Sequence, residues 1–226
     1  VSFSNNSNAP SELPRSVQFV LTDGDGGTSV PVQQTVQVIA VNDRAVLGTI
    51  PPTNSYVENA PPVILAPAAT ITDSDSINFA GGNLTIRYLS GGTAADGLFV
   101  RNEGFGVGQI GIAGTSILFG GQTIGTLNSN VGIGTTSLII FLNVNATPVT
   151  TRALLRNVTF ANVSENPATA PRNIQFLLND GDGGTSLSVT QVMSVTAVND
   201  APVITLPGGI PTFTQSGPAI DIDSTA

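Results

Sequence analysis

Apolar and polar residues alternate along several stretches of this chain. The pattern is clearest at residues 83–88, 173–178 and 187–198. Because successive side chains of a strand point to opposite faces of a sheet, this period of two predicts half-buried β-strands. Between residues 91 and 134, short apolar runs alternate with Gly, Asn and Ser clusters at a spacing of about ten residues, which is typical of an antiparallel sandwich.

One segment departs from this pattern and predicts a short helix. Thr147 is suited to cap a helix N-terminus, and Pro148 is suited to the first helical position. Val149, Leu154 and Leu155 would then share one face of the helix. We expect strand to resume after this segment.

The chain repeats itself with an offset of 157 residues. Residues 1–43 align with residues 158–200 without a gap, and 24 of the 43 positions are identical. The same offset carries Tyr56 onto Phe213. Internal repetition of this kind predicts an array of similar domains. We therefore expect three parts, cut from a longer chain: the C-terminal part of one repeat (1–43), one complete repeat (44–200) and the N-terminal strand region of the next (201–226).

The most distinctive repeated string is Asp-Gly-Asp-Gly-Gly-Thr-Ser, at 23–29 and 180–186. Each copy precedes an alternating strand that ends in Asn-Asp, at 42–43 and 199–200. Such a strand would carry oxygen ligands at both ends. Calcium is bound by about six to eight oxygen atoms from carboxylates, amide side chains, backbone carbonyls and water, so these strings indicate calcium.

The order of these acidic strings resembles the cadherin-like tandem repeats of large bacterial surface proteins. It is carried by Glu58-Asn59, Asp73-x-Asp75 with Asn83, Asp180-Gly-Asp182 and Asn199-Asp200-Ala-Pro. The resemblance implies an all-β fold, an antiparallel Greek-key β-sandwich of about seven strands. Here the unit would be 157 residues long, with one short helix per repeat, and the Gly-rich stretch 91–146 looks like an insertion.

The resemblance also implies calcium at two domain junctions. Ligands of the first junction would be Asn42, Asp43, Asp73, Asp75, Asn83 and Asp180. Ligands of the second would be Glu58, Asn199 and Asp200, joined by Glu165 in place of the glutamate of an Asp-Arg-Glu motif that the chain lacks. The first linker also carries Arg44, which adds a positive charge to that site.

The acidic strings have an alternative interpretation as turns. Asp, Asn and Gly form tight turns because their side chains bond the local backbone or tolerate positive φ. Turns alone, however, do not require Asp at so many of these positions, and clustered unpaired carboxylates repel one another. An EF-hand does not fit, because the twelfth residue counted from Asp23 or Asp73 is Gln34 or Leu84 instead of Glu.

Composition removes several classes of function. The net charge is −8 and the seven basic residues are all Arg, whereas nucleic-acid binding requires a basic surface. The chain has neither His nor Cys, which removes the commonest general base and the thiolate nucleophile, so we expect no enzyme. No apolar run is long enough to span a bilayer. Residues 106–111 match the glycine spacing of a dinucleotide-binding motif. That motif binds phosphate at the N-terminus of the helix that follows it, and no helix is predicted directly after residue 111.

We therefore expect a structural segment of a long extracellular, cell-surface stalk, adhesin or filament with calcium-stiffened junctions. Its partners would be neighbouring repeats of the same chain or identical subunits, and also a surface polysaccharide or another adhesion target. One alternative is a polysaccharide- or protein-binding module built on residues 91–146, which predicts that Tyr88, Phe99 or Phe105 is exposed. Another is a filament subunit whose partial ends are completed by strand exchange between copies.

Overall fold

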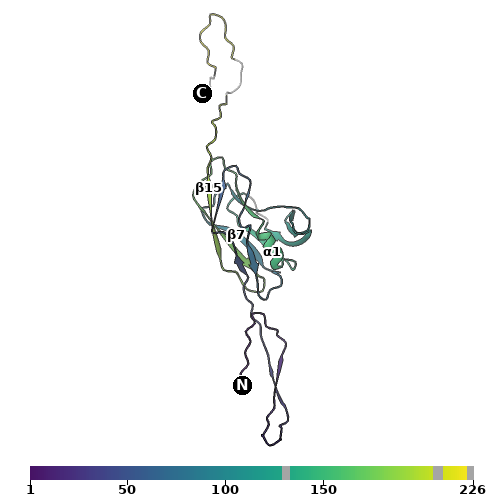
Figure 1. Ribbon diagram of the computed structural model, residues 1–226. Helices are drawn as coiled ribbons and strands as arrows, with labels where there is room; N and C mark the ends of the chain where they lie inside the picture. The colour runs from purple at the N-terminus through teal and green to yellow at the C-terminus, as the bar shows by residue number, and fades with distance from the viewer. Residues whose placement is uncertain (129–132, 206–210, 223–226) are drawn as a thin grey trace.

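The computed structural model describes residues 1–128, 133–205 and 211–222. Figure 1 shows an elongated molecule in which residues 44–200 form a packed central body. Residues 1–43 extend from one end of this body, and residues 201–205 and 211–222 extend from the opposite end. The regular structure consists of strands with one short helix, which confirms the expected all-β, sandwich-like class. The Greek-key connectivity and the cadherin resemblance stay predictions.

The larger sheet of the body has eight strands, in the order β4-β15-β14-β7-β12-β11-β10-β9. β15 and β4 are parallel, and the other neighbours are antiparallel. Because β12 pairs with β7, strands β9 to β12 extend this sheet, whereas β8 from the same Gly-rich stretch 91–146 belongs to the smaller sheet. The strands are β4 (Thr53–Val57), β7 (Asn83–Ser90), β9 (Ile110–Ala113), β10 (Ser116–Phe119), β11 (Gln122–Leu127), β12 (Leu138–Leu142), β14 (Arg172–Asn179) and β15 (Val189–Thr196).

A smaller sheet shares one core with the larger sheet. Its strands lie in the order β5-β13-β8, and a separate pair joins β3 to β6. Leu98 and Phe160 from the smaller sheet are buried together with Ile86 and Phe176 from the larger one. The ring of Phe160 also meets Tyr56 edge to face, with ring centroids 5.5 Å apart. These strands are β3 (Val46–Gly48), β5 (Val63–Ile64), β6 (Thr70–Thr72), β8 (Asp96–Val100) and β13 (Val158–Asn162).

The helix α1 (Pro148–Leu155) lies where the sequence predicts it. Thr147 caps it by accepting a hydrogen bond from the backbone N–H of Thr150 at 3.3 Å, and Leu154 and Leu155 are buried. No helix in the part of the chain that the structure describes is long and apolar enough to cross a membrane.

A buried ion pair ties the two sheets together. Arg172 on β14 donates from Nε to Asp96 Oδ2 at 3.1 Å and from Nη2 to Asp96 Oδ1 at 3.2 Å. Asn162 on β13 donates to Asp96 Oδ1 at 2.7 Å, and Asp96 itself lies on β8. Arg172 and Asp96 are both fully buried, so each charge depends on the other for its compensation. Burial, together with the charge of Asp96, raises the pKa of Tyr88 above its ordinary value.

The repeated sequence corresponds to a repeated hairpin. β1 (Arg15–Phe19) and β2 (Val32–Val36) form a two-stranded antiparallel sheet outside the central body. Arg15 faces Val36 in this hairpin, just as Arg172 faces Met193 in the pair β14–β15. The hairpin of the first 43 residues therefore has the same register as its counterpart in the body.

Candidate metal sites at the two ends of the central body

Three carboxylates meet at the end where the chain leaves the body. Single oxygen atoms of Glu58, Glu165 and Asp200 all lie within 4.8 Å of one another. Glu58 directly follows β4 and Asp200 follows β15, so the parallel pairing of these two strands carries both residues to the same end. These three residues could hold a metal ion. All three belong to the ligand set that the sequence predicts for the second junction.

Glu58 is the buried member of this triad, with 4% of its surface exposed. Its Oε2 accepts a hydrogen bond from the backbone N–H of Val198 at 2.6 Å, which fixes the outgoing chain beside β4. Its other oxygen, Oε1, is buried and has no hydrogen-bond partner among the described residues. A buried carboxylate oxygen without a donor is costly, and a bound cation is one of the few groups that compensates it.

The fourth residue predicted for this junction is Asn199. Asn199 is exposed, and its side-chain nitrogen donates to the backbone carbonyl of Asp200 at 3.2 Å. Asn59, which the sequence pairs with Glu58 but does not place among the ligands, donates to Glu165 Oε2 at 3.2 Å. Asn59 has φ 62°, a left-handed conformation that Asn tolerates better than most residues. Its place directly after Glu58 was the available signal.

At the opposite end, Asp73 and Asp75 form a turn directly after β6. Asp73 Oδ1 accepts hydrogen bonds from the backbone N–H groups of Asp75 and Ser76, at 3.2 and 2.9 Å. Asp75 Oδ2 accepts the backbone N–H of Asp43 at 2.9 Å, which attaches the incoming linker. The remaining oxygens, Asp73 Oδ2 and Asp75 Oδ1, are buried and have no partner among the described residues. Burial raises the pKa of Asp73, and the charge of Asp75 adds to this shift.

Asp180 connects the same linker to the Gly-rich turn. Its Oδ1 accepts the backbone N–H groups of Asp182 and Gly184, both at 2.9 Å, and its Oδ2 accepts Asn42 Nδ2 at 3.1 Å. A Cβ atom added to Gly184 would lie 2.1 Å from Asp180 Oδ2, so the turn requires glycine there. Asp180 Oδ1 therefore stabilises the turn, as the turn interpretation predicts. Asp180 Oδ2 instead binds Asn42 of the linker.

Two further residues at this end make hydrogen bonds that the predicted ligand set does not describe. Asn83 begins β7, and its side-chain oxygen accepts a hydrogen bond from Thr85 at 2.9 Å; no hydrogen bond given by the described residues links it to the acidic side chains. Asp182, which was not among the predicted ligands, accepts the Ser76 hydroxyl at 3.5 Å. Its position as the second Asp of the repeated string was the signal for it.

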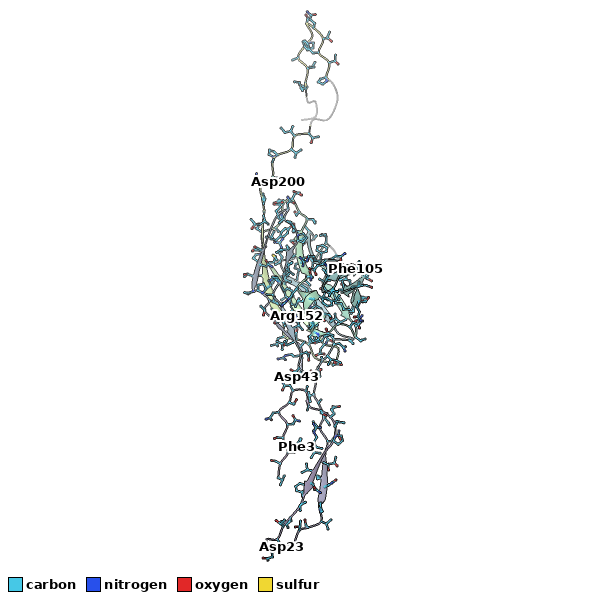
Figure 2. The ribbon with its side chains drawn as sticks, turned by 45° about the vertical axis from the view of Figure 1, so that its right-hand side comes forward. Phe3, Asp23, Asp43, Phe105, Arg152 and Asp200 are labelled. Atoms are coloured by element: carbon cyan, nitrogen blue, oxygen red, sulfur yellow. The ribbon has the colours of Figure 1, made fainter. Side chains whose placement is uncertain are left out.

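The entry end also carries a cleft. Asn42, Asp43 and Arg44 line a cleft of about 570 Å³ there. Within residues 1–128, 133–205 and 211–222, only the exit end brings three carboxylates within 4.8 Å of one another. Figure 2 shows Asp43 and Asp200 at opposite ends of the body.

No protein-family model matches this chain, and no curated protein matches it. The cadherin resemblance is therefore carried by the residues quoted above and stays a hypothesis.

Proposed function

We propose that this chain is a structural segment of a long extracellular tandem-repeat stalk, adhesin or surface filament whose domain junctions bind calcium. One observation carries the proposal. The described residues contain six buried side-chain oxygen atoms without a hydrogen-bond partner, and three of them are carboxylate oxygens of Glu58, Asp73 and Asp75. All three residues were expected to be calcium ligands, and they lie at the two ends of the body.

The shape of the body supports an end-to-end array. The chain enters at one end and leaves at the opposite end, so copies joined in sequence extend along one line (Figure 1). At each junction the exit end of one repeat would supply Glu58, Glu165 and Asp200, and the entry end of the next would supply Asp73 and Asp75. Together these residues offer the number and type of oxygen atoms that calcium binds.

The stiffening is electrostatic in origin. Without a cation, the carboxylates gathered at a junction repel one another and favour separated domains. A divalent ion bound by ligands from both neighbours stabilises the arrangement in which the two ends meet. The partners in this proposal are neighbouring repeats or identical subunits, the location is the cell surface, and no catalytic step is assigned to the chain.

The test joins two copies of residues 44–200 directly, so that one complete junction forms in the middle. We expect calorimetric titration to show calcium binding, and small-angle scattering to show a longer particle in calcium than in chelator. Glu58→Gln in the first copy with Asp73→Asn in the second should remove both effects. Glu103→Gln in both copies also removes two negative charges, on the flank of the body, and is the matched control. Equal scattering in calcium and chelator would refute the stalk proposal.

Strand exchange at the partial ends is the competing assembly. In the body, β4 pairs with β15 and β5 with β13, so residues 201–226 of one copy could bring equivalents of β4 and β5 to residues 1–43 of another. Those residues contain no counterpart of β7, the strand that covers the other side of β14. Strand exchange would therefore leave that side of the β14 counterpart uncovered. The mass of the native material under denaturing conditions decides, because strand exchange requires a chain near 23.0 kDa.

A further inference from the structure

A groove on the flank of the body collects positive charge in an otherwise acidic chain. It lies between α1, the end of β10 and the segment after β8, and encloses about 470 Å³. Three of the seven arginines of the chain line it, namely Arg101, Arg152 and Arg156, together with one carboxylate, Glu103. Three positive charges and one negative charge leave the groove at +2, whereas the whole chain carries −8.

Two of these arginines have free donors. Arg101 is occupied, because it donates to Asn157 Oδ1 at 2.8 Å and pairs with Glu103. Arg156 donates from Nε to the backbone carbonyl of Ala69 at 2.8 Å, and no hydrogen bond uses its two terminal nitrogens in the part of the chain that the structure describes. Arg152 makes no side-chain hydrogen bond or ion pair within that same part. Arg152 and Arg156 are four residues apart, so they share one face of the helix and its first following turn.

Aromatic rings accompany these arginines. Phe119 lines the groove and is half-buried. Phe105 is 53% exposed, and its ring packs against the backbone of Gly111, where an added Cβ would lie 2.5 Å from Phe105 Cδ1. The loop that carries Phe105 is fixed, because Gln109 Oε1 accepts the backbone N–H of Gly106 at 2.9 Å. Figure 2 shows Phe105 and Arg152 on the body, between the two ends.

A binding module built on residues 91–146 predicts that Tyr88, Phe99 or Phe105 is exposed, and one of these three residues is exposed. Tyr88 and Phe99 are half-buried, whereas Phe105 presents much of its ring to solvent. The aromatic side chain that lines the groove together with the two guanidinium groups is Phe119, and Phe105 is not among the lining residues. That combination is suited to a ligand with both an apolar face and a negative charge.

We propose that this groove binds an acidic polysaccharide, with uronic-acid carboxylates on Arg152 and Arg156 and a sugar ring against the side chain of Phe119. A guanidinium matches a carboxylate with two parallel hydrogen bonds, and an aromatic plane covers the C–H face of a sugar ring. The groove wall combines apolar side chains, among them Ile64, Pro67 and Phe119, with the arginines, so an apolar surface for a sugar ring lies next to donors for its carboxylate. The proposal is independent of calcium at the junctions.

The test uses the full 226-residue chain and a defined oligogalacturonate, titrated in chelator so that calcium bridging plays no part. We expect saturable binding that weakens as salt is added, and loss of binding when the sugar carboxylates are methyl-esterified. Arg152→Gln should weaken binding about tenfold, equivalent to about 1.4 kcal/mol. The guanidinium of Arg152 has no partner in the described structure, so this variant should keep its thermal stability.

Arg87→Gln is the matched control, because Arg87 is exposed on β7, bonds Gln175 and does not line the groove. This variant should bind as the original chain does. Equal weakening by both variants would mean only a general response to charge and would overturn the proposal. Binding of the methyl ester, or absence of binding to the free acid, would also overturn it. Binding of oligoglutamate in preference to oligogalacturonate, lost in Arg152→Gln, would replace the polysaccharide with an acidic peptide.

Discussion

The hairpins β1–β2 and β14–β15 have closely similar sequences and the same register, yet their side chains are in different environments. Phe19 is 42% exposed and its counterpart Phe176 is fully buried. Leu21 is 73% exposed and its counterpart Leu178 is also fully buried. β14 lies between β15 and β7 in the body, whereas β1 has only β2 beside it. The sequence of a hairpin therefore determines its register, and the surrounding strands determine whether its apolar face is buried.

The two hairpins share the hydrogen bonds that depend only on residues close in sequence. Asp23 Oδ1 accepts the backbone N–H groups of Asp25 and Gly27, in the same pattern as Asp180. Arg15 donates to the carbonyls of Ser11 and Leu13, the counterparts of the two carbonyls that Arg172 contacts. What Arg15 lacks in the described structure is a carboxylate in the place of Asp96. Short-range hydrogen bonds thus form in both copies, while the long-range ion pair forms in one.

The largest effect should come from breaking that ion pair. Arg172→Met leaves Asp96 buried without its cation, and we expect the free energy of unfolding to fall by about 3–5 kcal/mol. Arg15→Met should change it by less than about 0.5 kcal/mol, because Arg15 is not buried against a charge. Urea unfolding of both variants checks this. Similar losses in the two variants would show that the hairpins are equally supported.

A cavity in the core should have the next largest effect. Leu178→Ala removes a fully buried side chain and should cost about 2–5 kcal/mol. Leu21→Ala, at the equivalent exposed position, should cost less than about 0.5 kcal/mol. Thermal unfolding followed by circular dichroism measures the difference. A substantial loss in Leu21→Ala would mean that the N-terminal hairpin is covered by another surface in solution.

A substitution in the turn should separate the two hairpins by a smaller amount. In Gly184→Ala the new Cβ meets Asp180 Oδ2 and also approaches the Arg44 backbone, at 2.1 and 3.0 Å, so we expect a cost of about 1–3 kcal/mol. In Gly27→Ala the Cβ meets only the exposed Asp23 carboxylate, which can move into solvent. Denaturant unfolding of both variants tests this expectation. An unchanged Gly184→Ala midpoint would show that the linker contact is loose.

The smallest expected effect is a pH dependence of the stability, which arises from Asp73 in the central body. The pKa of Asp73 is raised by burial and by Asp75, so the folded protein binds a proton there more readily than the unfolded chain. In chelator, this stabilising contribution is complete below the unfolded pKa of about 3.9 and is lost as the pH rises through the folded value. Asp73→Asn should flatten this part of the profile of unfolding midpoint against pH. An unaltered profile would contradict the assignment.

Part of the fold could be predicted because its signals are local. The alternation in β7, β14 and β15 and the cap of α1 at Thr147 depend on neighbouring residues only. The pairing of β12 with β7 could not be predicted, because it joins segments more than 40 residues apart and no period in the sequence encodes it. The sequence shows residues 91–146 only as an insertion, and it gives no signal that strands β9 to β12 within them extend the main sheet beyond β7.

The candidate site divides in the same way. Glu58 and Asp200 were assigned to one junction by the resemblance, and they lie together. Glu165 came from the resemblance and lies with them. Asp182 was missed because its contact with Ser76 joins two turns that are distant in sequence. Asn83 was assigned from its place in the motif, but its side chain bonds its own strand at Thr85.

The parallel pairing of β4 with β15 has a mechanical consequence. The chain enters before β4 and leaves after β15, so a force that separates the two termini pulls these neighbouring strands in opposite directions along their own axes. Five residue pairs, from Val192 with Thr53 to Thr196 with Val57, are then loaded in shear at the same time. A hairpin pulled from its open end instead yields one hydrogen bond after another. Tension along the length of the body therefore loads the hydrogen bonds between β4 and β15 together, and they resist it jointly.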